Sequence, residues 1–211
     1  MITHWNQLNF WRSGEWQVIQ EKLDDLKKQG ITYNPEKKNL FRALKETPYA
    51  NVKAVIMGQD PYPNHNHATG IGFDVPTTTN PLPVTLQNIF KEYQDDLHLP
   101  EPISGSLIPW CRAGVLLWNA YPSCLAGKPG SHHWDEWTYL TKEIVEKLDE
   151  TRIVFCFLGA KATMFSVYAS RSPVVTTSHP SALGVKWGFK GSRIFRKINN
   201  LLEVPIDWRL P

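Results

Sequence analysis

Four short apolar runs each end on a polar segment, and this repeated pattern constrains the fold more than any other feature of the sequence. The runs are Val52 to Met57, Val115 to Trp118, Ile153 to Leu158 and Val174 to Thr177. Runs of this length without alternation are typical of strands buried on both faces of a parallel sheet. Since open α/β sheets bind ligands beyond the carboxyl ends of their strands, the four polar segments are expected to meet at one crevice.

Helical patterns lie between and around these runs. One stripe, Trp16 to Leu26, can be stopped by Gly30, and two others cover Trp137 to Leu148 and Ile194 to Leu202. Two further helices are predicted from capping signals: Asn34-Pro35 ahead of Leu40, Phe41 and Leu44, and Thr85 ahead of Leu86, Ile89, Phe90 and Tyr93. Alternation of helices and strands predicts parallel crossovers. We therefore expect one domain over residues 1–211, a three-layer αβα sandwich around a central, mainly parallel four-stranded sheet.

The composition excludes several classes of protein. Hydrophobic residues make up 42% and charged residues 20% of the 211 positions, which is too apolar for a disordered chain. No apolar stretch approaches the roughly 20 residues that cross a bilayer, and the first six residues lack the pattern of a secretion signal. We expect an intracellular protein without membrane association, cytoplasmic if the source is prokaryotic.

The cysteines and histidines give no pattern of a metal site. Cys111, Cys124 and Cys156 are too few for a typical iron–sulfur cluster, and are expected to be reduced thiols in or near the core. The pairs His65/His67 and His132/His133 lack a cysteine or carboxylate at zinc-site spacing. No bound metal is expected.

A basic and aromatic segment runs from Lys186 to Lys197, with five cations and three aromatic residues in twelve positions. Such a mixture suits nucleic acid, because cations meet phosphates and aromatic rings can meet bases. It is equally typical of an amphipathic helix with a solvated basic face. Both interpretations can hold together, with Phe195 in the core and the cations outside.

Two of the polar segments carry ionisable groups suited to acid–base chemistry. Asp60 lies in Gly58-Gln59-Asp60-Pro61-Tyr62 after the first run, and His179 lies in Ser178-His179-Pro180-Ser181 after the fourth. Taken singly, Asp60 can be a loop aspartate that caps its own turn, and His179 can be a core histidine. Delivered to one crevice, they would form an acid–base pair.

At this point the sequence resembles family 1 uracil-DNA glycosylase. Five motifs match in order and spacing, and together they cover about residues 40 to 208. They are Gly58 to Tyr62, Gly70-Ile71-Gly72-Phe73, Pro83 to Ile89, Leu116 to Ala120 and His179 to Leu183. The resemblance implies a cofactor-free enzyme that hydrolyses uracil from single- and double-stranded DNA, acts as a monomer and leaves an abasic site. It does not identify any protein inhibitor or replication partner.

The resemblance also implies roles for individual residues. Asp60 would stabilise the positively charged sugar and orient the attacking water, while His179 and the backbone N–H of Gln59 would donate to the uracil O2. Asn119 would pair with uracil O4 and N3–H, Phe73 would stack on the base, and Tyr62 would block the C5 methyl of thymine. Without the resemblance, these last three are an asparagine in a turn and two ordinary core aromatics.

The remaining implied roles concern DNA. Leu183 matches the wedge that fills the stack after the base is extruded, and Thr85 and Ser181 match hydroxyls that hold phosphates. The basic residues expected to add to this grip are Lys161, Lys186, Lys190 and Arg193.

Three positions depart from the family pattern. Pro63 replaces the histidine that commonly follows Asp-Pro-Tyr, while Ala160 and Gly184 replace serines near the DNA. These losses affect the grip on DNA more than the chemistry. A catalytically weak DNA-binding or replication accessory protein with the same fold is an alternative, which the retained Asp60 and His179 oppose. A glycosylase for other lesions or for mismatched thymine is a further alternative, which Asn119 and Tyr62 oppose.

Overall fold

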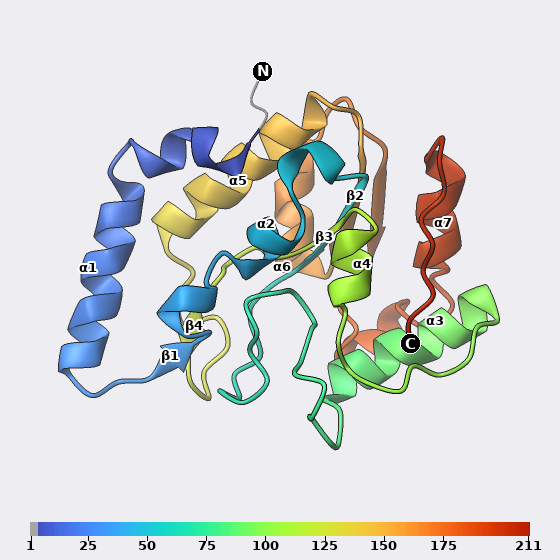
Figure 1. Ribbon diagram of the computed structural model, residues 1–211, viewed down its shortest axis with the longest axis horizontal. Coiled ribbons are helices and arrows are strands. Elements are labelled where there is room, and N and C mark those ends of the chain that lie inside the picture. The colour runs from blue at the N-terminus through green and yellow to red at the C-terminus, as the bar shows by residue number, and fades with distance from the viewer. Residues whose placement is uncertain (1–3) are drawn as a thin grey trace.

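The computed structural model describes residues 4–211 and has the predicted four-stranded parallel sheet with helices on both faces (Figure 1). The strand order is β3-β2-β5-β6, and every neighbouring pair is parallel. The strands are β2 (Ala54–Gly58), β3 (Val115–Asn119), β5 (Val154–Leu158) and β6 (Val174–Thr177). The sequence analysis expected no secretion signal in the first six residues. Residues 1–3 of this segment lie outside the described part.

A small antiparallel pair that the sequence did not predict lies apart from this sheet. It joins β1 (Tyr33–Asn34) to β4 (Cys124–Leu125). The longer helices are α1 (Glu15–Lys28), α3 (Val84–Leu97), α5 (Asp135–Asp149) and α7 (Ile194–Leu201), and the shorter ones are α2 (Arg42–Glu46), α4 (Ile108–Arg112) and α6 (Ala160–Thr163). The short 3₁₀ helices are η1 (Trp5–Gln7), η2 (Asn9–Trp11), η3 (Lys37–Asn39), η4 (Tyr49–Asn51), η5 (Met164–Tyr168) and η6 (Gly184–Trp187).

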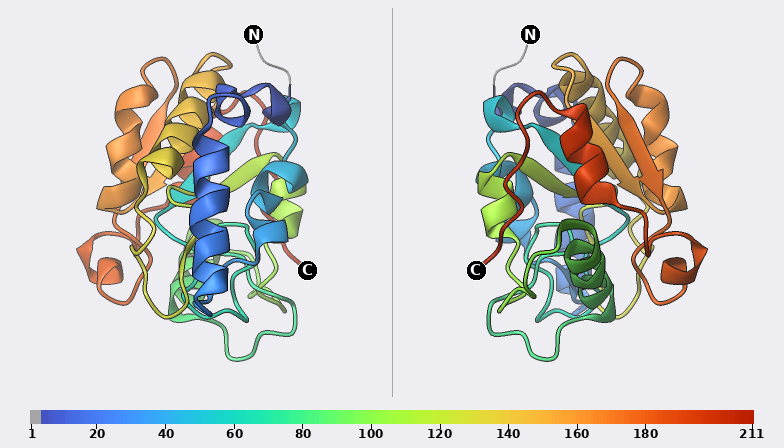
Figure 2. Two further views of the ribbon diagram at one scale, coloured as in Figure 1. Left: turned by 90° about the vertical axis from the view of Figure 1, so that its left-hand side faces the viewer. Right: turned by 90° about the vertical axis from the view of Figure 1, so that its right-hand side faces the viewer.

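The helices form a layer on each side of the sheet. Helices α5 and α6 cover one face, with α1 packed outside α5, while α4 and α7 cover the other face (Figure 2). Every residue of β2, β3 and β5 is buried, which explains why these strands are continuous apolar runs rather than alternating ones. Burying this apolar surface against both layers supplies most of the driving force for the fold.

Two predicted helix starts were wrong. No helix begins at Asn34-Pro35: Asn34 ends β1, and its buried amide donates to the carbonyl oxygens of Tyr62 and Pro63 rather than capping a helix. The predicted apolar residues belong to a turn and to α2, where Leu40 and Leu44 are buried. Thr85 does not cap α3, because that helix begins one residue earlier, at Val84. The other predicted helices, including the stop at left-handed Gly30, follow the prediction, whereas the short helices α4 and α6 were not predicted.

The three cysteines are free and buried, as expected. Burial raises the pKa of each thiol to about 12. Among residues 4–211, no helix is both long enough and apolar enough to cross a membrane.

The basic segment combines both interpretations of its sequence. Phe189 and Phe195 are fully buried, whereas Trp187 is 81% exposed beside exposed cations. The segment is fixed to α3 by the buried carboxylate of Glu92. Its oxygens accept hydrogen bonds from the backbone N–H of Gly191 at 2.6 Å and of Arg193 at 2.6 Å.

We predict that Glu92→Ala lowers the free energy of unfolding by about 1–3 kcal/mol, because it leaves backbone N–H groups without their acceptor. Urea denaturation of the variant and the native protein measures this difference. Glu21→Ala, on the exposed face of α1, is the matched control. A loss for Glu92→Ala no larger than for the control would contradict the anchoring role.

Candidate active site

A cavity of about 370 Å³ lies beyond the carboxyl ends of the strands. It brings together the segments that follow β2 and β6, which are far apart in the sequence. Its lining residues are Gln59, Asp60, Pro61, Tyr62, Pro63, Phe73, Thr85, Pro129, His179 and Ser181. The parallel sheet therefore presents one carboxylate and one imidazole to the same space.

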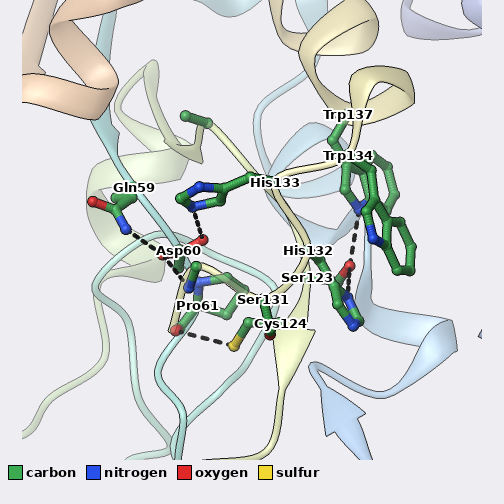
Figure 3. Close-up of polar contacts among 12 residues, drawn as sticks. Gln59, Asp60, Pro61, Ser123, Cys124, Ser131, His132, His133, Trp134 and Trp137 are labelled. Carbon is green, nitrogen blue, oxygen red and sulfur yellow. Dashed lines mark hydrogen bonds and ion pairs between the residues drawn. The ribbon is translucent and has the colours of Figure 1, made fainter. Parts of the chain in front are cut away.

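Asp60 is held by donors from two separate loops. Its Oδ2 accepts from Gln59 Nε2 at 2.6 Å and from the backbone N–H of Gly130 at 3.0 Å, and its Oδ1 lies 3.3 Å from Nε2 of His133 (Figure 3). Burial raises the pKa of Asp60, while the Gln59 hydrogen bond and the nearby His133 oppose this rise. The carboxylate is thus a buried group whose charged form depends on its neighbours.

His179 is oriented by its own turn. Its Nδ1 accepts from the backbone N–H of Ser181 at 3.1 Å, so in the neutral ring the proton is on Nε2. Burial lowers the pKa of His179 to about 4. At neutral pH the ring is therefore an uncharged donor.

Glycines allow the backbone to pass close to His179. A Cβ on Gly184 would lie 1.9 Å from the His179 carbonyl oxygen, and one on Gly159 would lie 2.9 Å from the His179 Cβ. The departure at Gly184 from the expected serine thus has a local steric reason: in this turn there is no room for a side chain.

An aromatic wall lies above the end of β2. The ring of Phe73 packs over Gly58, where a Cβ would come within 2.5 Å of the ring. The hydroxyl of Tyr62 donates to the Phe73 carbonyl oxygen at 3.2 Å, and burial raises the pKa of Tyr62. Asn119 does not line the cavity, but the sheet register pairs it with Gly58. Asn119 as a whole residue is 6% exposed, and within residues 4–211 its side-chain amide makes no hydrogen bond.

The residues expected to contact DNA fall into three groups. Thr85 and Ser181 line the cavity. Leu183 is 80% exposed on the loop that follows, an unusual place for a leucine that only packs in the core. The cations expected at the DNA are all exposed and lie outside the cavity lining: Lys161, Lys186, Lys190 and Arg193.

The sequence analysis missed the loop from Gly127 to His133. Pro129 lines the cavity, Gly130 binds Asp60, and His133 faces Asp60. The available signal was the loss of a histidine at Pro63, which invites a search for another imidazole. His132 points elsewhere: it is buried, with Nδ1 2.8 Å from Ser123 Oγ and its ring stacked on Trp134. No set of three His, Cys, Asp or Glu side chains in the described range is grouped to hold a metal.

Comparison with known proteins gives consistent matches. The family model described as "Uracil DNA glycosylase superfamily" matches residues 44–203. Uracil-DNA glycosylase from Coxiella burnetii is 43% identical over 203 residues, covering 91% of this chain and 88% of that protein. Uracil-DNA glycosylase 1 from Streptomyces coelicolor is 38% identical over 188 residues, covering 86% of this chain and 83% of that protein.

Solved structures give the same result. The crystal structure of mimivirus uracil-DNA glycosylase superposes with a TM-score of 0.86 at 25% identity, covering 96% of this chain and 85% of the other. A variant of the mimivirus protein in complex with UGI gives a TM-score of 0.87 at 25% identity, covering 96% and 87%.

We predict that His179 stays neutral down to about pH 5, because burial lowers its pKa to about 4. Nitrogen-detected NMR of the imidazole should show a proton on Nε2 and none on Nδ1 at neutral pH. The His179→Gln variant assigns the resonance. A ring that became charged near pH 6.5, the ordinary value for histidine, would contradict this prediction.

Proposed function

The chain belongs to the uracil-DNA glycosylase superfamily and excises uracil from DNA, and we propose that the cavity between Asp60 and His179 is where it does so. The observation that carries this proposal is the pairing of a buried carboxylate with a neutral imidazole donor in one 370 Å³ space. The volume is within the range of small-ligand pockets.

Breaking the bond between uracil and deoxyribose leaves positive charge on the sugar and negative charge on the base. We propose that ionised Asp60 stabilises the sugar and orients the attacking water. The Asp60 side chain is only 5% exposed, so the carboxylate acts at a lower dielectric than bulk water, where a fixed charge has a greater effect. The hydrogen bonds from Gln59 and Gly130 keep it oriented before substrate arrives.

His179 is proposed to donate from Nε2 to the uracil O2 as negative charge collects there, together with the backbone N–H of Gln59. A neutral donor is sufficient because the negative charge on the leaving base strengthens the hydrogen bond during the reaction. Keeping the ring neutral also avoids the cost of burying an unpaired cation.

Uracil selection is assigned to the side-chain amide of Asn119 and to the aromatic wall formed by Phe73 and Tyr62. Asn119 can accept from N3–H and donate to O4, whereas cytosine presents the opposite pattern at these two atoms. Its lack of a partner within the described residues leaves both groups available to a base. Phe73 is proposed to stack on uracil, and Tyr62 to occupy the space that the C5 methyl of thymine would need.

The enzyme must extrude its target base, since the glycosidic bond is out of reach inside a duplex. We propose that Leu183 enters the vacated stack and that Thr85 and Ser181 hold adjacent phosphates. Lys161, Lys186, Lys190 and Arg193 would add attraction to the DNA backbone, offsetting the hydroxyl that Ala160 lacks. We further propose that one copy of the chain acts alone on single- and double-stranded DNA. We propose that it does so inside the cell, in the cytoplasm if the source is prokaryotic.

Asp60→Asn tests the assigned centre. We expect the rate of uracil release to fall roughly a hundredfold or more, since a preorganised charge in a buried site contributes several kcal/mol to the transition state. Single-turnover release from uracil-containing oligonucleotides, with EDTA present, measures the rate. Binding of DNA to the variant, followed by fluorescence anisotropy, should persist.

A native-like rate of uracil release by Asp60→Asn would show that Asp60 is not part of the catalytic centre. Native protein that binds uracil-containing DNA but releases no uracil would instead identify an accessory protein that keeps the fold without the activity.

Leu183→Ala tests the wedge. We expect a larger loss of rate on duplex DNA than on a single strand, because unstacking costs a few kcal/mol only where a stack has to be broken. Matched oligonucleotides in both forms give the ratio. A thermal melt serves as the control for stability, which should change little because Leu183 is exposed. Equal fractional losses on the two substrates would return Leu183 to a packing role.

A further inference from the structure

Pro63 leaves Asp60 without an imidazole from its own segment. The family commonly carries a histidine directly after Asp-Pro-Tyr, and this chain has Pro63 there. Two histidines follow closely, but they face other groups: His65 Nδ1 lies 2.8 Å from Asn34 Oδ1, and the ring of His67 packs edge-on against Tyr62. Within residues 4–211 neither contacts Asp60 or lines the cavity.

A histidine from a different loop takes this place. Nε2 of His133 lies 3.3 Å from Oδ1 of Asp60, and Figure 3 shows the imidazole directed at the carboxylate. The ring is stacked on Tyr121, with centroids 3.9 Å apart and planes 26° apart. Stacking fixes the plane of the ring, so Nε2 faces Asp60 without depending on a bound substrate.

Strand β4 and the loop that carries His133 are fastened to the segment Asp60–Pro63 at three points. Cys124 Sγ lies 3.7 Å from the Pro61 carbonyl oxygen, the Gly127 N–H donates to the Pro63 carbonyl oxygen at 2.9 Å, and the Gly130 N–H donates to Asp60 Oδ2. Pro63 therefore lacks an imidazole but helps to hold the loop that supplies one.

Asp60 Oδ1 and His133 Nε2 can each supply the hydrogen-bond partner that the other lacks. Asp60 Oδ1 and His133 Nε2 are both buried, and in the described residues neither has an aligned hydrogen-bond partner. A buried carboxylate oxygen requires a donor, and hydrogen bonds at active sites often align fully only when substrate is bound. The only ionisable side chain that faces Oδ1 at this distance in that range is His133.

We propose that His133 is the positioning residue of Asp60 and replaces the histidine that is absent at position 63; this rests on the proposed function of Asp60. With its proton on Nε2, His133 donates to Oδ1, while Gln59 and Gly130 donate to Oδ2. The carboxylate is then held by both oxygens, ionised and directed at the sugar. His133 acts through Asp60 and takes no part in bond making or breaking.

The pH dependence of the reaction separates this role from a purely structural one. Asp60 must be ionised to stabilise the sugar, so activity falls as pH falls through its pKa. Burial raises this pKa, and the hydrogen bond from Gln59 and the proximity of His133 lower it. Removing His133 therefore moves the acid limb of the pH–rate profile to higher pH.

Three titratable groups that border the site keep one charge state between pH 5 and 8. His179, across the cavity, has a pKa lowered to about 4 by burial, and Cys124, on the loop side, has a pKa raised to about 12 by burial and by the charge of Asp60. Burial also raises the pKa of Tyr62.

The experiment compares His133→Ala and His133→Gln with the native chain in single-turnover uracil release from pH 5 to 8. We expect His133→Ala to lower the rate roughly tenfold to a hundredfold, by analogy with side chains that orient metal ligands through hydrogen bonds, and to move the acid limb upward with DNA affinity unchanged. His133→Gln keeps a donor and should lose less. His65→Ala is the matched control, and thermal melts establish that each variant is folded.

A second pair of variants tests the replacement itself. Pro63→His in the His133→Ala background should recover activity relative to His133→Ala alone. A folded double variant that recovers none would overturn the replacement. A folded His133→Ala variant with native rate and native acid limb would overturn the positioning role, even while Asp60→Asn is inactive. If Asp60→Asn were itself active, the proposed function of Asp60 would be contradicted, whatever the result for His133.

Discussion

The burial of one carboxylate at the end of a parallel sheet is the constraint on which the site depends. Asp60 follows a strand with no exposed residue, so its charge has left bulk water and must be compensated by fixed donors. Those donors come from Gln59 and from the loop that contains Gly130 and His133. The same desolvation that makes the group costly to ionise makes its charge effective against a developing cation. The contacts that hold this loop in place therefore also hold the carboxylate in position for the reaction.

The three departures from the family pattern differ in kind. Pro63 removes an imidazole from one segment, and the structure presents another from a loop tied to the Pro63 carbonyl oxygen. Gly184 has a steric cause, because a side chain there would overlap the carbonyl of His179. Ala160 is exposed at the start of α6, and nothing in the structure explains the loss of a hydroxyl at this position. The absence of a family residue can thus be offset by a residue from another loop, as at Pro63, or be imposed by packing, as at Gly184. At Ala160 it has no structural explanation.

Much of the fold could be predicted from the sequence, because apolar periodicity records which faces are buried. The four strands and the long helices α1, α5 and α7 follow their apolar patterns closely. The capping signals were less reliable. Asn34 has the side chain of a helix cap, yet its amide binds the carbonyl oxygens of Tyr62 and Pro63, because a buried amide pairs with whichever groups the fold brings near. The pair β1–β4 was missed for a related reason, since two-residue strands have no periodicity to detect.

The sequence by itself predicted the segments that follow the strands, with Asp60 and His179 in them, and its resemblance to the uracil-DNA glycosylase family added Phe73 and Thr85; all four residues line the cavity. Parallel strands place their carboxyl ends at one edge, and this rule turns order along the chain into proximity in space. Only the tertiary structure decided which groups complete the site. The contact of His133 with Asp60 joins loops 73 positions apart, and the neutral state of His179 arises from burial by several segments. Burial and facing contacts between distant loops have no local signature, because they depend on where the whole chain packs.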